Sequence, residues 1–294
     1  MDVLTRLAAL GAVLLLVGCS SSGDAGSARP AADRPSAAAS PSAGASPSAG
    51  ASPGAAASPS AAPVTDPGYL ALGDSVAAGV GADDPARDGY VPVLAELLSD
   101  RCSGGAAQGC PVQVRNLAVP GATTSTLLRD QLPTALELLR TGDVRVVTVT
   151  VGGNDVFLPV LQACARTPEA PTCASAVRAA LGAVDSGVDR LLGELSAAAG
   201  QDTTVAVMTY YDPLAACRLA PLQPLAEQVL EGTAGEDGLN DVLRARAAEH
   251  GAVVVDTAER LAVPDDFVGG FDCLHPSTSG HAAIAEAFAD AVAG

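Results

Sequence analysis

Three side chains of this sequence could together carry out nucleophilic catalysis. Ser75 closes a Gly-Asp-Ser turn after an apolar run, and far along the chain His275 follows Asp272 by three positions. A serine hydroxyl becomes an effective nucleophile when an imidazole takes its proton and a carboxylate orients that imidazole. The chain has only 3 histidines. The pattern predicts a serine hydrolase with Ser75 as nucleophile, His275 as base and Asp272 as orienting acid.

The remaining histidines and the aspartate beside the serine fit structural roles better. His281 falls inside a predicted closing helix without an aspartate three residues earlier, and we expect it to support the catalytic loop. His250 precedes Gly251 at a predicted helix end, where an imidazole interacts favourably with the helix dipole. Asp74 adjoins the nucleophile, and because adjacent side chains point apart we expect it to stabilise the turn.

The elements that must position these residues alternate between strand and helix. The segment 144–151 carries the strongest strand pattern, with β-branched residues nearly throughout. This alternation predicts an α/β fold with a parallel sheet covered on both faces, where ligands bind at the carboxyl ends of the strands. The predicted strands are residues 69–72, 112–118, 144–151, 203–208 and 253–255; the predicted helices are residues 91–98, 126–140 with an interruption at Pro133, 174–198, 238–249 and 279–292.

Polar and glycine-rich turns follow the first three predicted strands. They contain Ser75, then Gly121, then Asn154 with Asp155 beside it. Backbone N–H groups in such turns and a primary amide suit an oxyanion hole. We therefore expect Ser75, Gly121 and Asn154 to converge as oxyanion donors, with Asp155 making backbone hydrogen bonds near them.

These blocks, in this order, resemble the SGNH (GDSL-type) esterase/lipase superfamily over about residues 69–290. The resemblance implies a three-layer α/β/α flavodoxin-like fold with a central parallel sheet, and no metal or cofactor. It assigns Ser75 as nucleophile and, through its N–H, as oxyanion donor. Gly121 and Asn154 are the other donors, His275 the base and Asp272 the acid.

The amino-terminal part carries export signals. Residues 1–18 contain an apolar run of roughly a dozen residues, short of the about 20 that span a bilayer, which suits a signal peptide. Its end, Leu16-Val17-Gly18-Cys19, resembles a lipobox, so we expect lipid on Cys19 and anchoring to the outside of the cell membrane, with a released secreted form also open. An ordinary signal peptide with an incidental cysteine is the alternative. Residues 19–67, rich in Ala, Ser, Pro and Gly, are expected to be a disordered tether, and residues 68–294 the hydrolase domain.

Six cysteines remain after Cys19, an even number that predicts disulfides in an exported protein. Six cysteines allow 15 pairings. Short spacing favours two local loops, and the remaining two cysteines would then pair. A structural zinc site is the alternative, but no C-x-x-C spacing exists. The favoured pairs are Cys102–Cys110, Cys164–Cys173 and Cys217–Cys273.

The charge pattern excludes several other classes of protein. The formal net charge is −17 and the chain contains no lysine. A Walker-type phosphate lysine, a Schiff-base lysine and a Ser-Lys pair are therefore excluded. An acidic domain also disfavours nucleic acid and anionic head groups as partners. We expect a monomer.

The sequence thus predicts a carboxylic ester hydrolase acting outside the cell on lipid-like or short acyl esters. The segments 156–175 and 210–235, which include Tyr210 and Tyr211, look like insertions over the cleft that would set specificity. A carbohydrate O-deacetylase or an acyltransferase of the cell envelope could use the same site. A catalytically inactive envelope-binding protein is the alternative from another class.

Overall fold

The computed structural model describes residues 68–102, 110–140, 143–214, 220–258, 260–261, 263–270 and 272–293. The expected signal peptide, Cys19 and the tether lie outside these residues, as do Cys217 and the side chains of Cys102 and Cys273. Within the described part, no helix combines the length and apolar character needed to cross a membrane.

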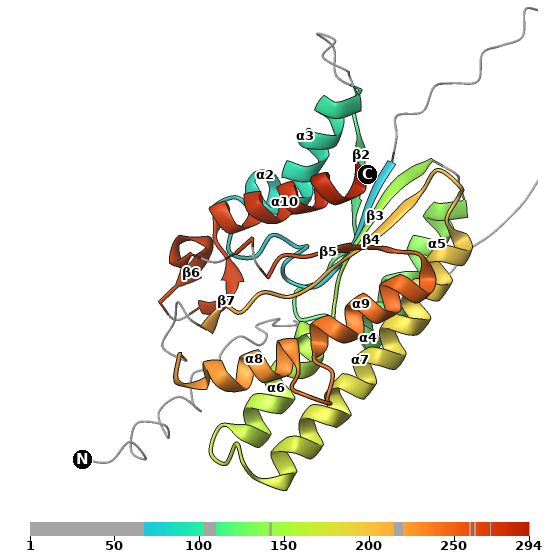
Figure 1. The fold of residues 1–294 in the computed structure, drawn as a ribbon. Helices are drawn as coiled ribbons and strands as arrows, with labels where there is room; N and C mark the ends of the chain where they lie inside the picture. Colours follow the sequence, from blue (N-terminus) through green and yellow to red (C-terminus); the bar gives the residue numbers. More distant parts are fainter. Residues whose placement is uncertain are drawn as a thin grey trace, which may run out of the picture. The chain divides into compact units, whose positions relative to one another are not determined.

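The centre of the fold is a five-stranded sheet in the order β2-β1-β3-β4-β5 (Figure 1). Every pair of neighbouring strands in it is parallel. This order is the flavodoxin-like one, in which the winding direction reverses between β1 and β3. The expected fold class is therefore confirmed. The strands are β1 (Gly68–Gly73), β2 (Gln113–Asn116), β3 (Val144–Thr150), β4 (Thr204–Met208) and β5 (Val253–Val255).

The central strands are buried on both faces because helices cover both. Neighbouring residues, which point to opposite faces of the sheet, are both buried: Tyr69 and Leu70 in β1, and Val147 and Thr148 in β3. Parallel strands covered in this way are mostly apolar, and the two buried threonines of β3 are hydrogen-bonded, Thr148 to Tyr69 and Thr150 to Asp74.

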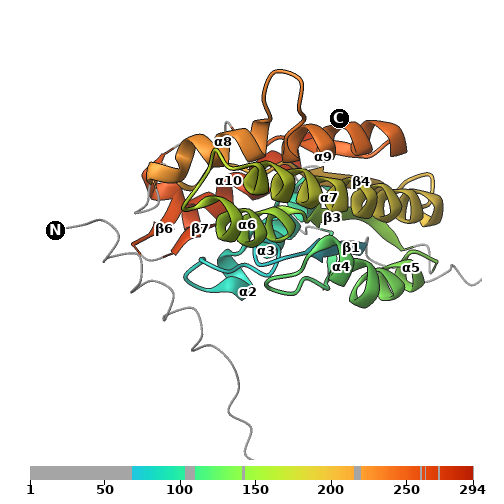
Figure 2. The same ribbon diagram turned by 90° about the horizontal axis from the view of Figure 1, so that it is seen from below.

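Two helical layers sandwich the sheet (Figures 1 and 2). On one face, α3 and α10 pack together, and Tyr90 stacks on Phe288 with ring centroids 5.1 Å apart. On the other face, α7 packs against α4, α5 and α9. The helices are α2 (Pro85–Asp88), α3 (Tyr90–Cys102), α4 (Thr124–Asp130), α5 (Leu132–Arg140), α6 (Gly153–Cys164), α7 (Pro171–Ala198), α8 (Gln223–Glu231), α9 (Leu239–His250) and α10 (Thr278–Val292).

The predicted helix 126–140 is two helices, α4 and α5. The break falls at Gln131, the C-cap of α4, just before the expected interruption at Pro133. Pro133 is the second residue of α5, where a missing N–H removes no intrahelical bond. The predicted interruption is therefore present, two residues before the proline, which lies in the first turn of the second helix.

The two suspected insertions contain helices that lie at one end of the sheet. The first holds most of α6 and the start of α7, and the second holds α8. Figure 1 shows α6 and α8 at the same end as a two-stranded antiparallel hairpin, β6 (Phe267–Gly269) and β7 (Asp272–Pro276). Cys164 at the end of α6 is disulfide-bonded to Cys173 in α7, as the short spacing predicts. Cys110 is disulfide-bonded as well.

Candidate active site

The turn that carries Ser75 is built from the end of β1. Gly73 has a φ of +152°, and a Cβ at this position would collide with Thr150 at the end of β3. The side chain of Gln131 clamps the same residue: its Oε1 accepts from the Gly73 N–H at 2.9 Å and its Nε2 donates to the Gly73 carbonyl at 2.8 Å. The backbone before Ser75 is therefore fixed from two sides.

Asp74 is buried and stabilises this turn, as expected. Its Oδ1 accepts hydrogen bonds from the Val76 N–H and the Thr150 hydroxyl, each at 3.0 Å. Its Oδ2 accepts from the hydroxyl of Tyr210. Burial raises the pKa of Asp74, although the hydrogen bonds oppose the shift.

Asp272 and His275 lie together on β7 of the antiparallel hairpin. Nδ1 of His275 is 2.7 Å from Oδ2 of Asp272. The other carboxylate oxygen accepts from the backbone N–H groups of Leu274 at 3.0 Å and His275 at 3.1 Å. Burial alone would raise the pKa of Asp272, but these hydrogen bonds and the imidazole hold it below its usual value. The carboxylate thus stays ionised and faces one ring nitrogen.

The structure brings the imidazole to the serine across the chain. Nε2 of His275 lies 2.9 Å from Oγ of Ser75. Tyr211 supports the hairpin that carries His275: its hydroxyl donates to the Leu274 carbonyl on β7 at 3.1 Å, and its ring centroid lies 5.4 Å from that of Phe267 on β6. An aspartate, an imidazole and a serine hydroxyl therefore form one continuous hydrogen-bonded chain.

The three expected oxyanion donors line one pocket together with His275. Gly121 has a φ of +80° and is exposed. The segment before it continues the sheet pairing, since the Val119 N–H donates to the Gly73 carbonyl at 3.0 Å. Asn154, the second residue of α6, donates one amide hydrogen to the Ala122 carbonyl at 3.0 Å. This bond holds the amide beside Gly121.

Asp155 connects the segment of Gly121 to the segment of Asn154 through hydrogen bonds. Its carboxylate accepts from the Thr124 N–H at 2.9 Å and from the Thr124 hydroxyl at 2.7 Å. The expected backbone hydrogen bond near the site is therefore present. Because Thr124 opens α4 and Asp155 lies in the first turn of α6, the pair fixes the distance between the segments of Gly121 and Asn154.

The pocket beside Ser75 has a volume of about 340 Å³, within the usual range for ligand sites. Its polar residues lie in the three strand-end turns, at His275 on β7, and at Tyr210 and Tyr211, and the rest of its lining is apolar. The apolar side chains come mainly from α6, α8 and the segments flanking α8. They are Val76, Val80, Pro120, Val156, Phe157, Val160, Leu161, Pro213, Leu214, Leu222, Leu225, Ala226, Val229, Leu230, Leu239 and Leu274.

We expected His281 to support the segment of His275, but the described hydrogen bonds of its ring go to the segment that follows Ser75 and to the start of α3. His281 is completely buried, with Nε2 3.0 Å from the Val80 carbonyl and Nδ1 accepting from the Tyr90 N–H at 3.3 Å. Burial lowers the pKa of His281, although the bond to Val80 opposes the shift. A neutral ring with Nε2–H donating satisfies both neighbours.

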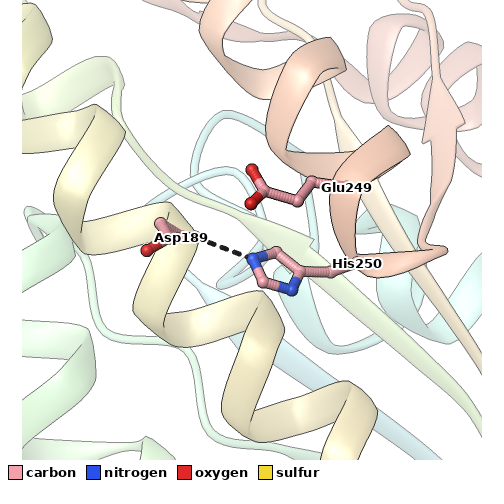
Figure 3. Close-up of side chains that lie close together, drawn as sticks. All are labelled: Asp189, Glu249 and His250. Atoms are coloured by element: carbon pink, nitrogen blue, oxygen red, sulfur yellow. Dashed lines mark hydrogen bonds and ion pairs between the residues drawn. The ribbon is translucent and has the colours of Figure 1, made fainter.

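His250 lies in the last turn of α9, as expected, with Nε2 2.8 Å from Asp189. Figure 3 shows Asp189 on α7 facing His250, with Glu249 nearby. The three could offer ligands to a cation, but Arg246 already lies 2.5 Å from Glu249 and 3.5 Å from Asp189. The carboxylates therefore have a cationic partner. None of the three residues lines the pocket of Ser75, and we assign no metal to them.

Two side chains important to this geometry are not evident from sequence. Gln131 and Thr150 hold the turn through contacts with residues far away in the chain. For Tyr210, only its position in the sequence indicates a role at the site: it follows β4 at the carboxyl edge of the sheet, where ligands bind.

The chain belongs to the GDSL-like lipase/acylhydrolase family. The family model matches residues 71–283, a range that includes every candidate catalytic and oxyanion position. The resemblance inferred from sequence is thereby confirmed, and the protein belongs to the serine ester hydrolases. No curated protein sequence matches the chain.

Solved structures share the fold at low identity. The lipase Lip_vut3 from a goat rumen metagenome is 21% identical with a TM-score of 0.56, covering 76% of this chain and 97% of its own. An extracellular lipase from Streptomyces rimosus is 20% identical with a TM-score of 0.54, covering 76% of this chain and 99% of its own. Phospholipase A1 from Streptomyces albidoflavus NA297 is 21% identical with a TM-score of 0.52, covering 77% of this chain and 100% of its own.

Proposed function

We propose that the protein hydrolyses carboxylic esters with an apolar acyl part, through an acyl-enzyme on Ser75. The observation that carries this proposal is the hydrogen-bonded chain from Asp272 through His275 to Ser75 at the rim of a largely apolar pocket. The two distances, 2.7 and 2.9 Å, are within hydrogen-bond reach.

The mechanism follows from which nitrogen faces which partner. With Nδ1–H directed to Asp272, Nε2 of His275 is free of its proton and accepts the one on Ser75 as Oγ attacks the ester carbonyl. The imidazolium then protonates the leaving alcohol as the C–O bond breaks. Water enters, gives a proton to His275 and attacks the acyl-enzyme carbonyl. As the intermediate collapses, the bond to Ser75 Oγ breaks, His275 returns the proton to Oγ, and the free acid leaves.

The carbonyl oxygen gains negative charge in both steps. The N–H groups of Ser75 and Gly121 and the amide of Asn154 are the donors that would stabilise it, each fixed by the turns described above. A fixed donor needs no reorganisation during the reaction, which is why loss of one costs about 10²–10³ in rate.

The chemistry of the pocket favours an ester with an apolar acyl chain over an acetylated sugar. The lining beyond the catalytic residues is mainly aliphatic and aromatic, so it offers few partners to sugar hydroxyls, and burying an unpaired hydroxyl is unfavourable. The apolar run in residues 1–18 and the lipobox-like Leu16-Val17-Gly18-Cys19 support action outside the cell, anchored through lipid on Cys19.

The test is labelling with a fluorophosphonate together with hydrolysis of p-nitrophenyl butyrate. We expect the wild type to label and turn over, and Ser75→Ala to do neither. Ser186→Ala on the exposed side of α7 is the matched control and should behave as wild type. Turnover by folded Ser75→Ala would overturn the assignment, and an unreactive wild type would favour an inactive binding protein.

A further inference from the structure

The pocket extends well beyond what catalysis at Ser75 requires. Along α6, Val156 and Val160 form one apolar row and Phe157 and Leu161 the next, spaced four residues apart. Residues at this spacing lie on one face of a helix. This face of α6 therefore forms a continuous apolar wall that starts beside Asn154.

Helix α8 supplies a second apolar wall of the same pocket. Leu225, Ala226, Val229 and Leu230 line it, while Gln228 is exposed and does not. Of the described side chains that line the pocket, none on α6 or α8 beyond Asn154 is polar. A ligand lying between these helices must therefore be apolar along its length.

The dimensions limit how long that ligand is. Leu161 follows Asn154 by seven residues, which is about 10 Å along a helix. An extended alkyl chain advances about 1.3 Å per carbon, given C–C bonds of about 1.5 Å. The wall from the oxyanion donor to Leu161 thus matches roughly eight carbons.

Both walls are fixed in place. The Cys164–Cys173 disulfide joins the end of α6 to α7. At the end of α8, Glu231 accepts from the amide of Asn240 at 2.6 Å, and the same amide donates to the Tyr210 carbonyl at 2.8 Å and accepts from the Tyr210 N–H at 2.7 Å. A pocket with braced walls discriminates chain length because it does not expand to fit longer chains.

We infer that the space between α6 and α8 holds the acyl chain of the substrate, extended, and that Leu161 limits it to medium length, about eight carbons. This inference rests on the proposed ester hydrolysis at Ser75. It adds the substrate class, esters of medium-chain unbranched acids, and a residue that determines specificity.

The first test compares kcat/KM for p-nitrophenyl acetate, butyrate, octanoate and palmitate at concentrations below micelle formation. Each buried methylene can raise kcat/KM by up to about fourfold, so we expect a rise from acetate to octanoate and a fall at palmitate. A profile that is flat, or highest for acetate, would overturn the inference.

Substitutions at Leu161 should move this optimum in opposite directions. Leu161→Trp fills the far part of the pocket, so octanoate should lose on the order of tenfold relative to butyrate. Leu161→Ala lengthens the pocket and should shift the optimum toward longer chains. The neighbouring Gln162 is exposed and outside the pocket lining, so Gln162→Trp should keep the wild-type profile. An unchanged profile in both Leu161 variants would contradict the assignment.

Binding without turnover separates this inference from the catalytic proposal. Calorimetric titration of Ser75→Ala with sodium octanoate should show saturable binding that Leu161→Trp, introduced into the same protein, weakens by on the order of tenfold. If octanoate binds but the wild type hydrolyses no ester, the proposed ester hydrolysis is wrong, while the assignment of the pocket to an acyl chain stands. If the wild type hydrolyses all the esters but octanoate does not bind, the assignment of the pocket to an acyl chain is wrong, while the proposed ester hydrolysis at Ser75 stands.

Discussion

At the scale of single residues, buried groups outside the Asp-His-Ser chain hold the turn of Ser75 in place. Asp74 does not contact Ser75 through a described hydrogen bond; it accepts from Val76, Thr150 and Tyr210 and so fixes the turn. The Tyr210 ring also packs against Gly153, the residue before Asn154. One tyrosine therefore contacts both the turn that carries Ser75 and the segment that carries Asn154.

We predict that Tyr210→Phe lowers kcat by on the order of tenfold with KM little changed. Loss of the hydroxyl leaves the buried Asp74 without one donor, which costs about 1–3 kcal/mol of stability and loosens the turn. Measurements of kcat, KM and unfolding by urea test this.

The matched control is Tyr69→Phe. Tyr69 is also buried and its hydroxyl is 2.9 Å from that of Thr148, but it lines no part of the pocket. It should lose stability and keep kcat. Equal kcat in the two variants would show that Tyr210 acts only on stability.

At the scale of elements, the start of α6 positions the amide of Asn154. A Cβ at Gly153 would lie 2.8 Å from Cε1 of Tyr210, too close for the ring to stay where it is. The glycine thus permits α6 to begin against the tyrosine, which in turn sets where Asn154 points.

We predict that Gly153→Ala lowers kcat by about tenfold, somewhat less than the 10²-fold that a misplacement of about 1 Å can cause. Steady-state kinetics with p-nitrophenyl butyrate measure it. Gly182 in α7 is the control, because a Cβ there meets nothing within 4 Å. Gly182→Ala should keep kcat and gain up to about 1 kcal/mol of stability. If both alanine variants keep wild-type kcat, the packing of Tyr210 on Gly153 does not position the amide.

At the scale of the whole molecule, His281 couples stability to pH. The ring is buried at the start of α10 and contacts Val80 and Tyr90, so three segments meet at it. Burial lowers its pKa in the folded protein, whereas in the unfolded chain it has an ordinary pKa of about 6.5. Below about pH 6.5 the unfolded state therefore binds more protons than the folded state.

We predict that the free energy of unfolding falls as the pH drops from about 6.5 toward the lowered folded pKa of His281, with a slope of at most about 1.4 kcal/mol per pH unit from this group. His281→Gln should be less stable at pH 8 but show a shallower slope in this window. Urea unfolding between pH 8 and 5 measures both proteins, and carboxylates contribute equally to each. Parallel curves would show that His281 does not titrate on unfolding.

Much of the fold could be predicted because its determinants are local. The β-branched run at 144–150 favours a strand through its own composition and forms β3, and the alternation of strands and helices leads to a covered parallel sheet. The predicted interruption of 126–140 is present and falls at Gln131, two residues before Pro133, because a proline is favourable in the first turn of a helix. The sequence does not predict helix α6, because its N-cap Gly152 and its first residues Gly153 and Asn154 are of types typical of a turn.

The sequence by itself determined which residues could do chemistry and at which edge of the sheet they lie, because the type of residue and the strand it follows are properties of neighbours in the chain. Only the tertiary structure decided that Nε2 of His275 lies 2.9 Å from Ser75, that Tyr210 holds Asp74, and that α6 and α8 enclose an apolar pocket. These depend on distances between segments far apart in sequence, and such distances are set by how side chains pack, which no local pattern encodes.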